Sequence, residues 1–185
     1  MSTPPSRRKP RTDAERNRAR VLEAARALFA EQGYDVQMSE VARAAEVGVG
    51  TLYRHFPTRQ ALIEAAAEHR SGELLAFARE TCLATPDGLA RFLGHIGEVL
   101  ARDRGMSEAI ETAMGSTEPQ GETRTALQAV AGELIERGQA EGVIRPDVTV
   151  ADVNMIVCGL AAVIRNAAGD WRRYIEITLN GLHPR

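Results

Sequence analysis

Apolar residues recur along much of the chain at the three- and four-residue spacing that places them on one face of a helix. Two such stripes are Val21, Ala25, Leu28 and Phe29, and then Leu89, Phe92, Ile96, Val99 and Leu100. No segment of useful length alternates β-branched residues with polar ones, as a half-buried strand would. The pattern therefore predicts an all-α fold.

Capping residues, glycines and prolines divide this pattern into about nine helices. Thr12 and Glu15 form a capping-box pattern at the first helix, Gly33 ends it, and Thr149 and Asp170 are positioned to cap the last two. Pro86 is expected at the first position of a middle helix. The predicted helices run over 12–32, 39–45, 49–56, 59–81, 86–100, 107–114, 123–139, 150–167 and 171–182.

The composition divides the chain into three parts. Residues 1–11 are rich in Pro, Ser and Arg and are expected to form a disordered basic arm. Residues 12–57 hold three helices, of which the last two are short. Residues 58–185 hold the longer helices of a C-terminal bundle, which is large enough to bury a core without disulfides or metal.

Charge is distributed unevenly between the two ends. The whole chain of 185 residues has a formal net charge of −2. Residues 1–60 carry 11 Lys and Arg against 7 Asp and Glu, whereas residues 61–185 carry 12 against 18. A basic front and an acidic back indicate that only the front meets a polyanion.

The cysteines and histidines give no sign of catalysis or metal binding. Cys82 and Cys158 are far apart in apolar surroundings and without a CxxC pair, so we interpret them as small apolar residues, the alternative being a redox role. No paired metal-ligand motif is present. Neither a signal peptide nor a membrane span is evident. We expect a cytoplasmic protein with no metal, no cofactor and no membrane partner.

Two short helices joined by a tight turn, after a longer first helix, outline a helix-turn-helix unit whose second helix enters the DNA major groove. In the stretch VGVGTLYRHFPTRQAL, residues 47–62, Leu52 and Phe56 lie one turn apart and can face the core. The positions left facing outward are Val49, Gly50, Thr51, Tyr53, Arg54 and His55. Their backbone N–H, hydroxyl, imidazole and guanidinium groups suit phosphates and base edges.

Other residues near this stretch have two interpretations. Arg59 opposes the dipole of the helix it begins, which favours contact with an external anion. Tyr53 is also compatible with ordinary packing. The sequence Gly48-Val49-Gly50 is similar to part of a nucleotide-binding loop but lacks the preceding strand and the lysine. The basic arm either stays solvated or reaches the minor groove.

The chain resembles a known family, the TetR-type bacterial transcriptional regulators. The resemblance is carried by ALFAEQGY (27–34), SEVARAAEVGVGTLYRHFPTRQAL (39–62) and, more weakly, WRRYIEITLNGL (171–182). It implies a homodimer with an N-terminal DNA-binding headpiece and a C-terminal domain that binds a small molecule.

The resemblance also assigns residues. It adds Ser39, at the start of the second helix, to the expected DNA contacts, places the six outward residues of 49–55 on the recognition helix, and puts Arg59 at a phosphate-contacting position. Glu46 replaces the glycine usual in the turn, which implies strain if this residue is left-handed. Gly48 replaces the usual capping serine, which costs only a few tenths of a kcal/mol.

The helix predicted over 150–167 is apolar on nearly all sides. We expect one stripe to pack inside its own domain and another against a second copy, so that this helix and the last one form a four-helix dimer interface. The alternative is a central core helix in a monomer. The expected interface residues are Val150, Val153, Val157, Leu160, Ile164, Trp171, Ile175 and Leu179.

A ligand pocket is expected inside the C-terminal bundle, where the long helix from Arg59 can act as a lever on the headpiece. Candidate wall residues combine apolar bulk with flexible methionines. They are Phe77, Phe92, His95, Ile96, Met106, Ile110, Met114 and Met155. Few charges fall among them, so the predicted ligand is largely apolar and neutral or weakly charged, with His95 as its polar contact.

The functional hypothesis is a regulator, not an enzyme: a repressor released from a palindromic DNA operator by a small molecule. An activator, or a nucleoid protein without a ligand, remains open. A further alternative is an all-α enzyme or ligand carrier that does not bind DNA. An enzyme would require an acid–base pair in the C-terminal pocket, and the sequence offers no candidate.

Overall fold

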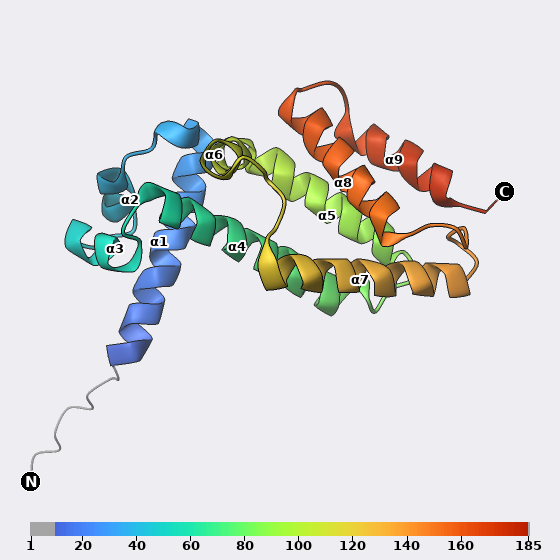
Figure 1. The fold of residues 1–185 in the computed structure, drawn as a ribbon, viewed down its shortest axis with the longest axis horizontal. Coiled ribbons are helices and arrows are strands. Elements are labelled where there is room, and N and C mark those ends of the chain that lie inside the picture. Colours follow the sequence, from blue (N-terminus) through green and yellow to red (C-terminus); the bar gives the residue numbers. More distant parts are fainter. Residues whose placement is uncertain (1–9, 185) are drawn as a thin grey trace, which may run out of the picture.

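The computed structural model describes residues 10–184, and over that range the protein is all-α with nine α-helices (Figure 1). This confirms the predicted fold class. The helices are α1 Pro10–Gln32, α2 Met38–Ala44, α3 Val49–His55, α4 Arg59–Phe77, α5 Gly88–Arg102, α6 Arg104–Met114, α7 Gly121–Ala140, α8 Val150–Arg165 and α9 Trp171–Leu182.

Several boundaries differ from the sequence prediction. Helix α1 begins at Pro10, so Thr12 lies inside the helix and is not its cap, and the rest of the predicted arm, residues 1–9, lies outside the described residues. The chain leaves α1 through Gly33, whose φ of +67° is left-handed. Helix α4 passes into a π-helical turn, Ala78–Cys82. Pro86 precedes α5 instead of beginning it.

The last two predicted caps are present. Thr149 Oγ1 accepts a hydrogen bond from the Asp152 backbone N–H (3.4 Å), and Asp152 Oδ2 accepts one from the Thr149 N–H (2.8 Å). The Thr149 hydroxyl also donates to Asp152 Oδ2 at 2.7 Å, and this bond, together with the one from the Thr149 N–H, lowers the pKa of Asp152. Asp170 accepts a hydrogen bond from the Arg172 N–H at 2.9 Å. Local sequence therefore determines where α8 and α9 begin.

Two hydrophobic cores stabilise the molecule. The first, the headpiece core, lies among α1, α2, α3 and the start of α4, and α6 completes it. Met106, Ala109 and Ile110 of α6 are almost completely buried there, beside Phe29 of α1. The headpiece, with one long and two short helices, thus buries its apolar face against a helix from the C-terminal part of the chain.

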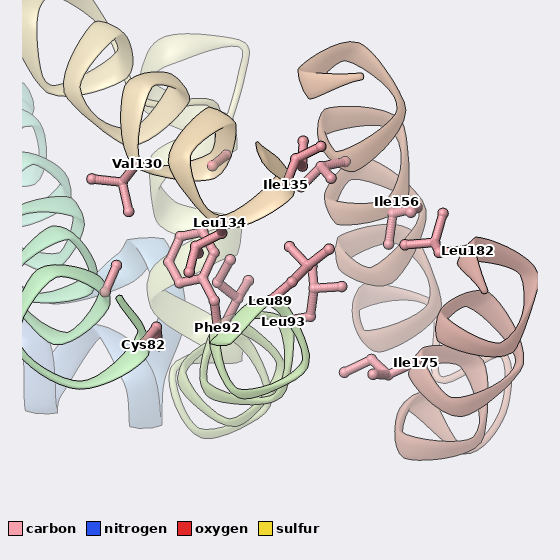
Figure 2. Packing of buried hydrophobic residues seen from close by; sticks show 14 of the residues in the cluster. Cys82, Leu89, Phe92, Leu93, Val130, Leu134, Ile135, Ile156, Ile175 and Leu182 are labelled. Carbon is pink, nitrogen blue, oxygen red and sulfur yellow. The ribbon is translucent and has the colours of Figure 1, made fainter. Parts of the chain in front are cut away.

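The second, the bundle core, joins α5, α7, α8 and α9. Figure 2 shows Leu134 of α7 directed towards Leu89 and Phe92 of α5, while Ile156 of α8 and Leu182 of α9 lie on the far side of the cluster. Helices α5 and α9 approach closely at Gly97, where a Cβ would overlap the Trp171 ring. In Figure 1, α4 and α7 lie along one edge of this bundle.

An ionic cluster around the buried Asp103 connects the headpiece to the bundle. Asp103, between α5 and α6, is 1% exposed and accepts hydrogen bonds from Arg26 of α1 (3.2 Å) and from Arg102 (3.0 Å). Glu23 binds the same Arg26 and, with Asp103, raises its pKa. Removing one partner of such a pair would leave the other charge buried and unpaired, which is energetically costly. The cluster therefore holds α1 against the α5–α6 junction.

Part of the expected dimer interface lies inside the protomer itself. Leu160, Ile164 and Ile175 are buried in the bundle core, and Val153 is 3% exposed. Trp171 and Leu179 are half-buried against the same core. The apolar stripe of α8 thus faces inward, because α8 packs on α5 and α7 as well as on α9. This corrects the assignment of the stripe to a second copy.

Candidate DNA-binding surface and ligand cavity

Helix α3 presents two distinct faces. Leu52 and Phe56 are buried in the headpiece core, as expected from their spacing. Val49 and Tyr53, elsewhere on the helix surface, are 45% and 46% exposed, so the helix presents their side chains to solvent. Figure 1 shows α3 at the end of the molecule remote from α8 and α9. The helix is therefore free to enter a groove.

The turn before α3 has the conformation that the sequence suggested. Glu46 has a φ of 51°, so this residue occupies the left-handed region, at the position where the resemblance described above implied glycine. Its carboxylate pairs with Arg20 of α1 at 2.8 Å. Gly48 is the N-cap of α3 and offers no side-chain bond to the helix, which leaves the first N–H groups of α3 without a side-chain cap.

Arg54 is held by its own helix in this structure. Its Nε donates to the Gly50 carbonyl at 3.2 Å and its Nη2 donates to Thr51 Oγ1 at 3.3 Å. Gly50 is exposed, Thr51 and His55 are half-exposed, and Ser39 is exposed in the first turn of α2. The expected DNA-binding residues of α2 and α3 thus have accessible side chains or backbone.

Arg59 has a second role that the sequence did not indicate. Its Nη1 donates to the Tyr34 carbonyl at 3.1 Å, and its guanidinium carbon lies 5.3 Å from the centre of the Tyr34 ring. The side chain therefore ties the start of α4 to the turn after α1. It remains half-exposed, so this contact is compatible with a bond to a phosphate.

An apolar cavity of about 150 Å³ lies in the C-terminal part among α4, α5, α7, α8 and the loop 115–120. Of the eight residues expected in a ligand pocket, Phe92 and Ile96 line it. Val150, Val153 and Val157, which were expected at a dimer interface, line this cavity from α8.

The other six expected pocket residues lie elsewhere. Met106 and Ile110 fill the headpiece core and Met114 packs against it, because α6 belongs to that core; Ile110 and Met114 also line a separate cavity beside the loop 115–120. Met155 is 66% exposed on the outside of α8. Helical spacing does not say which neighbour a face meets, so the sequence did not distinguish these positions from the walls of the cavity among α4, α5, α7 and α8.

Phe77 and His95 interact with each other instead of with the cavity. Their rings stack with centroids 3.8 Å apart and planes 24° apart. Burial lowers the pKa of His95, an effect that Glu98 opposes and Arg102 reinforces. His95 therefore packs on Phe77 and does not line the apolar cavity.

Sequence reasoning missed the polar residues of the cavity. Arg70 and Ser71 of α4 and Glu118 and Arg124 at the opposite wall all line it. A signal for Arg70 exists: it falls four residues after Ala66, on the buried face of α4. An arginine on an apolar stripe indicates either a buried ion pair or a binding site.

The described part of the chain offers neither a metal site nor a membrane span. No three His, Cys, Asp or Glu side chains among residues 10–184 gather in a way that could hold a metal ion. No helix in that range combines the length and the apolar character needed to cross a membrane.

Comparison with protein families identifies both parts of the chain. Residues 21–66 match the model of bacterial regulatory proteins of the tetR family. Residues 84–184 match the C-terminal domain of SbtR-like transcriptional regulators, a match that covers more than half of the chain. The first match contains α2 and α3, and the second contains most of the cavity walls.

Individual relatives support the same family assignment. A TetR regulatory protein from Mycobacterium vanbaalenii is 36% identical, with a TM-score of 0.72 over 95% of this chain and 100% of that one. The repressor KstR of Mycolicibacterium smegmatis is 35% identical over 55% of this chain, and the matches cover between 36% and 52% of such curated relatives. RolR, solved with resorcinol, shares the fold at 23% identity and a TM-score of 0.65. The chain thus belongs to the TetR family of DNA-binding transcriptional regulators, with an SbtR-like C-terminal domain, and is not an enzyme.

Proposed function

We propose that this regulator is a homodimeric repressor that binds a palindromic operator through α3 and leaves it when a small molecule occupies the C-terminal cavity. The outward face of α3, with Val49 and Tyr53 exposed, carries the proposal, since nothing in the protomer covers it. The basic front of the chain supports contact with phosphates. KstR is named as a repressor, which favours repression over activation.

Within this proposal the DNA contacts divide by chemistry. Thr51 and Arg54 are placed to reach base edges, once Arg54 exchanges its bonds to Gly50 and Thr51 for bonds to DNA. Tyr53, His55, Ser39 and the first N–H groups of α3 reach phosphates. Arg59 reaches a phosphate from the start of α4 while it holds Tyr34.

The dimer interface in this proposal uses the outward faces of α8 and α9. Met155 and Ile177 are 66% and 56% exposed, although they are large apolar residues on well-formed helices. Trp171 and Leu179 are half-buried and contribute their remaining surface. A twofold axis between these faces would place two copies of α3 for two half-sites.

A ligand in the cavity would change DNA binding by moving α4 and α6. Helix α4 begins in the headpiece, where Leu62 and Ile63 are buried, and ends beside the cavity, which Arg70 and Leu74 line. A continuous helix moves as a unit, so displacement at the cavity changes the position of the headpiece. A coupling of about 1–3 kcal/mol would change operator affinity roughly 5- to 150-fold.

The test is selection of binding sites from random duplex DNA, followed by gel-shift titration. We expect a palindrome, with affinity that falls steeply with salt because neutralised phosphates release counterions. Thr51→Ala should reduce the preference for one base at one half-site position by about 1–3 kcal/mol. Tyr53→Phe should instead weaken binding to all DNA sequences alike. Thr125→Ala, exposed on α7, serves as the matched control. Enrichment of no palindrome would contradict the proposal.

A further inference from the structure

Arg70 is a buried cation without a carboxylate partner of its own. It is 5% exposed, and among the described residues its one hydrogen bond runs from Nη1 to Ser107 Oγ of α6, at 3.0 Å. No acidic side chain in that part of the chain lies within ion-pair distance of its guanidinium. Arginine stays protonated in proteins, and its planar fork has further N–H groups to donate.

The nearest compensating charge is already engaged. Asp103 acts on Arg70 electrostatically, but its oxygens bind Arg26 and Arg102 at 3.0–3.4 Å. Burial lowers the pKa of Arg70 and Asp103 opposes this only in part, which indicates a cation that has lost water without gaining an equal partner. An incoming anion would supply what is missing.

The cavity that Arg70 lines has a net positive charge. Its other charged residues, Glu118 and Arg124, pair with each other at 3.6 Å, and the Cys158 thiol donates to the same Glu118. Glu118 is therefore compensated at the opposite wall, and Arg70 is left as the uncompensated charge. An anion entering this cavity meets attraction at Arg70 without net repulsion from Glu118.

The rest of the cavity is apolar and small. Phe92, Ile96, Leu100, Leu127, Val153 and Val157 form most of its walls. A volume of about 150 Å³ matches the engineered apolar cavity that holds benzene. The space therefore accommodates one ring or a short alkyl chain.

We propose that the effector is a small amphipathic carboxylate, with one ring or a short alkyl chain between α5, α7 and α8 and with its carboxylate on the Arg70 guanidinium. This inference rests on the proposed function and names the ligand class of its cavity. It sharpens the sequence prediction of a largely apolar, neutral or weakly charged ligand, and it replaces the predicted His95 contact with Arg70. A planar carboxylate matches the two-pronged donor geometry of arginine.

The same contact explains how a bound ligand would change the position of the headpiece. The Arg70–Ser107 bond joins α4 to α6, and Met106, next to Ser107, is buried in the headpiece core. A carboxylate that takes the Arg70 N–H groups competes with Ser107 for them. Loss of this bond frees α4 to move relative to α6 and to the headpiece packed on it.

The experiment measures binding of two acid–alcohol pairs, benzoate with benzyl alcohol and octanoate with octanol, to the full chain by calorimetry. We expect the better-fitting acid to bind about 10-fold or more tightly than its alcohol, as charge-assisted bonds require. The benzoate and octanoate arms distinguish an aromatic from an aliphatic effector. Equal binding of acid and alcohol in both pairs, or binding of neither acid, would overturn the inference.

Variants locate the contact. Arg70→Gln should lose about 10-fold or more of its acid affinity and keep its alcohol affinity, whereas Gln128→Ala, at a neutral polar residue that lines the same cavity, should change acid affinity less than about threefold. Arg70→Lys keeps the charge and should fall between wild type and Arg70→Gln. If Arg70→Gln does not fold, Arg70→Lys and the acid–alcohol pairs decide. An acid preference that persists in a folded Arg70→Gln would refute the contact.

A gel shift on the selected operator separates the two proposals. Release by the bound acid supports both of them. Release by a neutral compound with no effect of either acid contradicts the carboxylate inference and leaves the repressor intact. Acid that binds at Arg70 without changing operator affinity supports the ligand class and contradicts ligand-controlled release.

Discussion

At the scale of single residues, Glu46 shows how a functional turn tolerates a poor local choice. Its φ of 51° costs a non-glycine residue roughly 1–2 kcal/mol. The ion pair with Arg20 is exposed, and such pairs contribute about 0–1 kcal/mol, so it offsets the strain at most in part. The turn is nevertheless formed because Val41, Leu52 and Phe56 are buried on both sides of it.

Glu46→Gly should therefore stabilise the headpiece. We expect a gain of about 1 kcal/mol in the free energy of unfolding, measured by urea denaturation, because glycine adopts this φ without a steric penalty. Glu46→Ala is the matched control, since it removes the same ion pair and keeps the strain. A Glu46→Gly variant no more stable than Glu46→Ala would show that the turn is not strained.

At the scale of elements, two glycines of α5 have opposite surroundings. A Cβ at Gly97 would overlap the Trp171 ring of α9, whereas one at Gly94 would meet nothing within 4 Å. The close approach of α5 and α9 therefore depends on a missing side chain at one position of α5 only. Helix α9 in turn covers the outer side of the bundle core with Ile175 and Leu182.

Gly97→Ala should destabilise the protein by about 1–3 kcal/mol, as overpacking of a well-filled core does. Gly94→Ala, one turn earlier in the same helix, should stabilise it by about 0.5–1 kcal/mol through helix propensity. Thermal unfolding of both variants measures the contrast. Equal effects of the two substitutions would mean that α9 does not pack on α5 as described.

At the scale of the whole molecule, two of the exposed apolar residues lie on helices remote from the DNA-binding helix. Met155 on α8 and Ile177 on α9 have no cover in the protomer, and α3 lies at the far end of the long axis (Figure 1). A second copy that covers them would leave both copies of α3 free. The proposed dimer therefore explains the exposed residues without hiding the DNA-binding surface.

Ile177→Arg and Met155→Arg should each give monomers in light scattering, because the twofold axis buries two unpaired guanidinium groups per dimer. Operator affinity should fall because the dimer is lost. The folded protomer should keep its stability, since both positions are exposed in it. Val143→Arg, at an exposed apolar residue outside α8 and α9, is the control. Intact dimers of both α8 and α9 variants would place the interface elsewhere.

Much of this protein could be predicted from local patterns. The nine helices, the caps at Thr149 and Asp170 and the two faces of α3 follow from 3.6-residue periodicity and from hydrogen bonds within a few residues. The left-handed conformation of Glu46 was suggested by the resemblance to TetR-type regulators, which implied glycine at this position. Each of these features depends on residues that are neighbours in the chain.

The partners of each helix were decided only by the tertiary structure. Periodicity shows that α6 and α8 have buried faces, but it does not say that α6 completes the headpiece core or that Val150, Val153 and Val157 face a cavity. Arg70 is an ordinary arginine in sequence. Its burial beside Ser107, with Asp103 held by other arginines, arises where α1, α4, α5 and α6 meet. The free energy of a buried charge depends on all groups around it, and those groups come from distant parts of the chain.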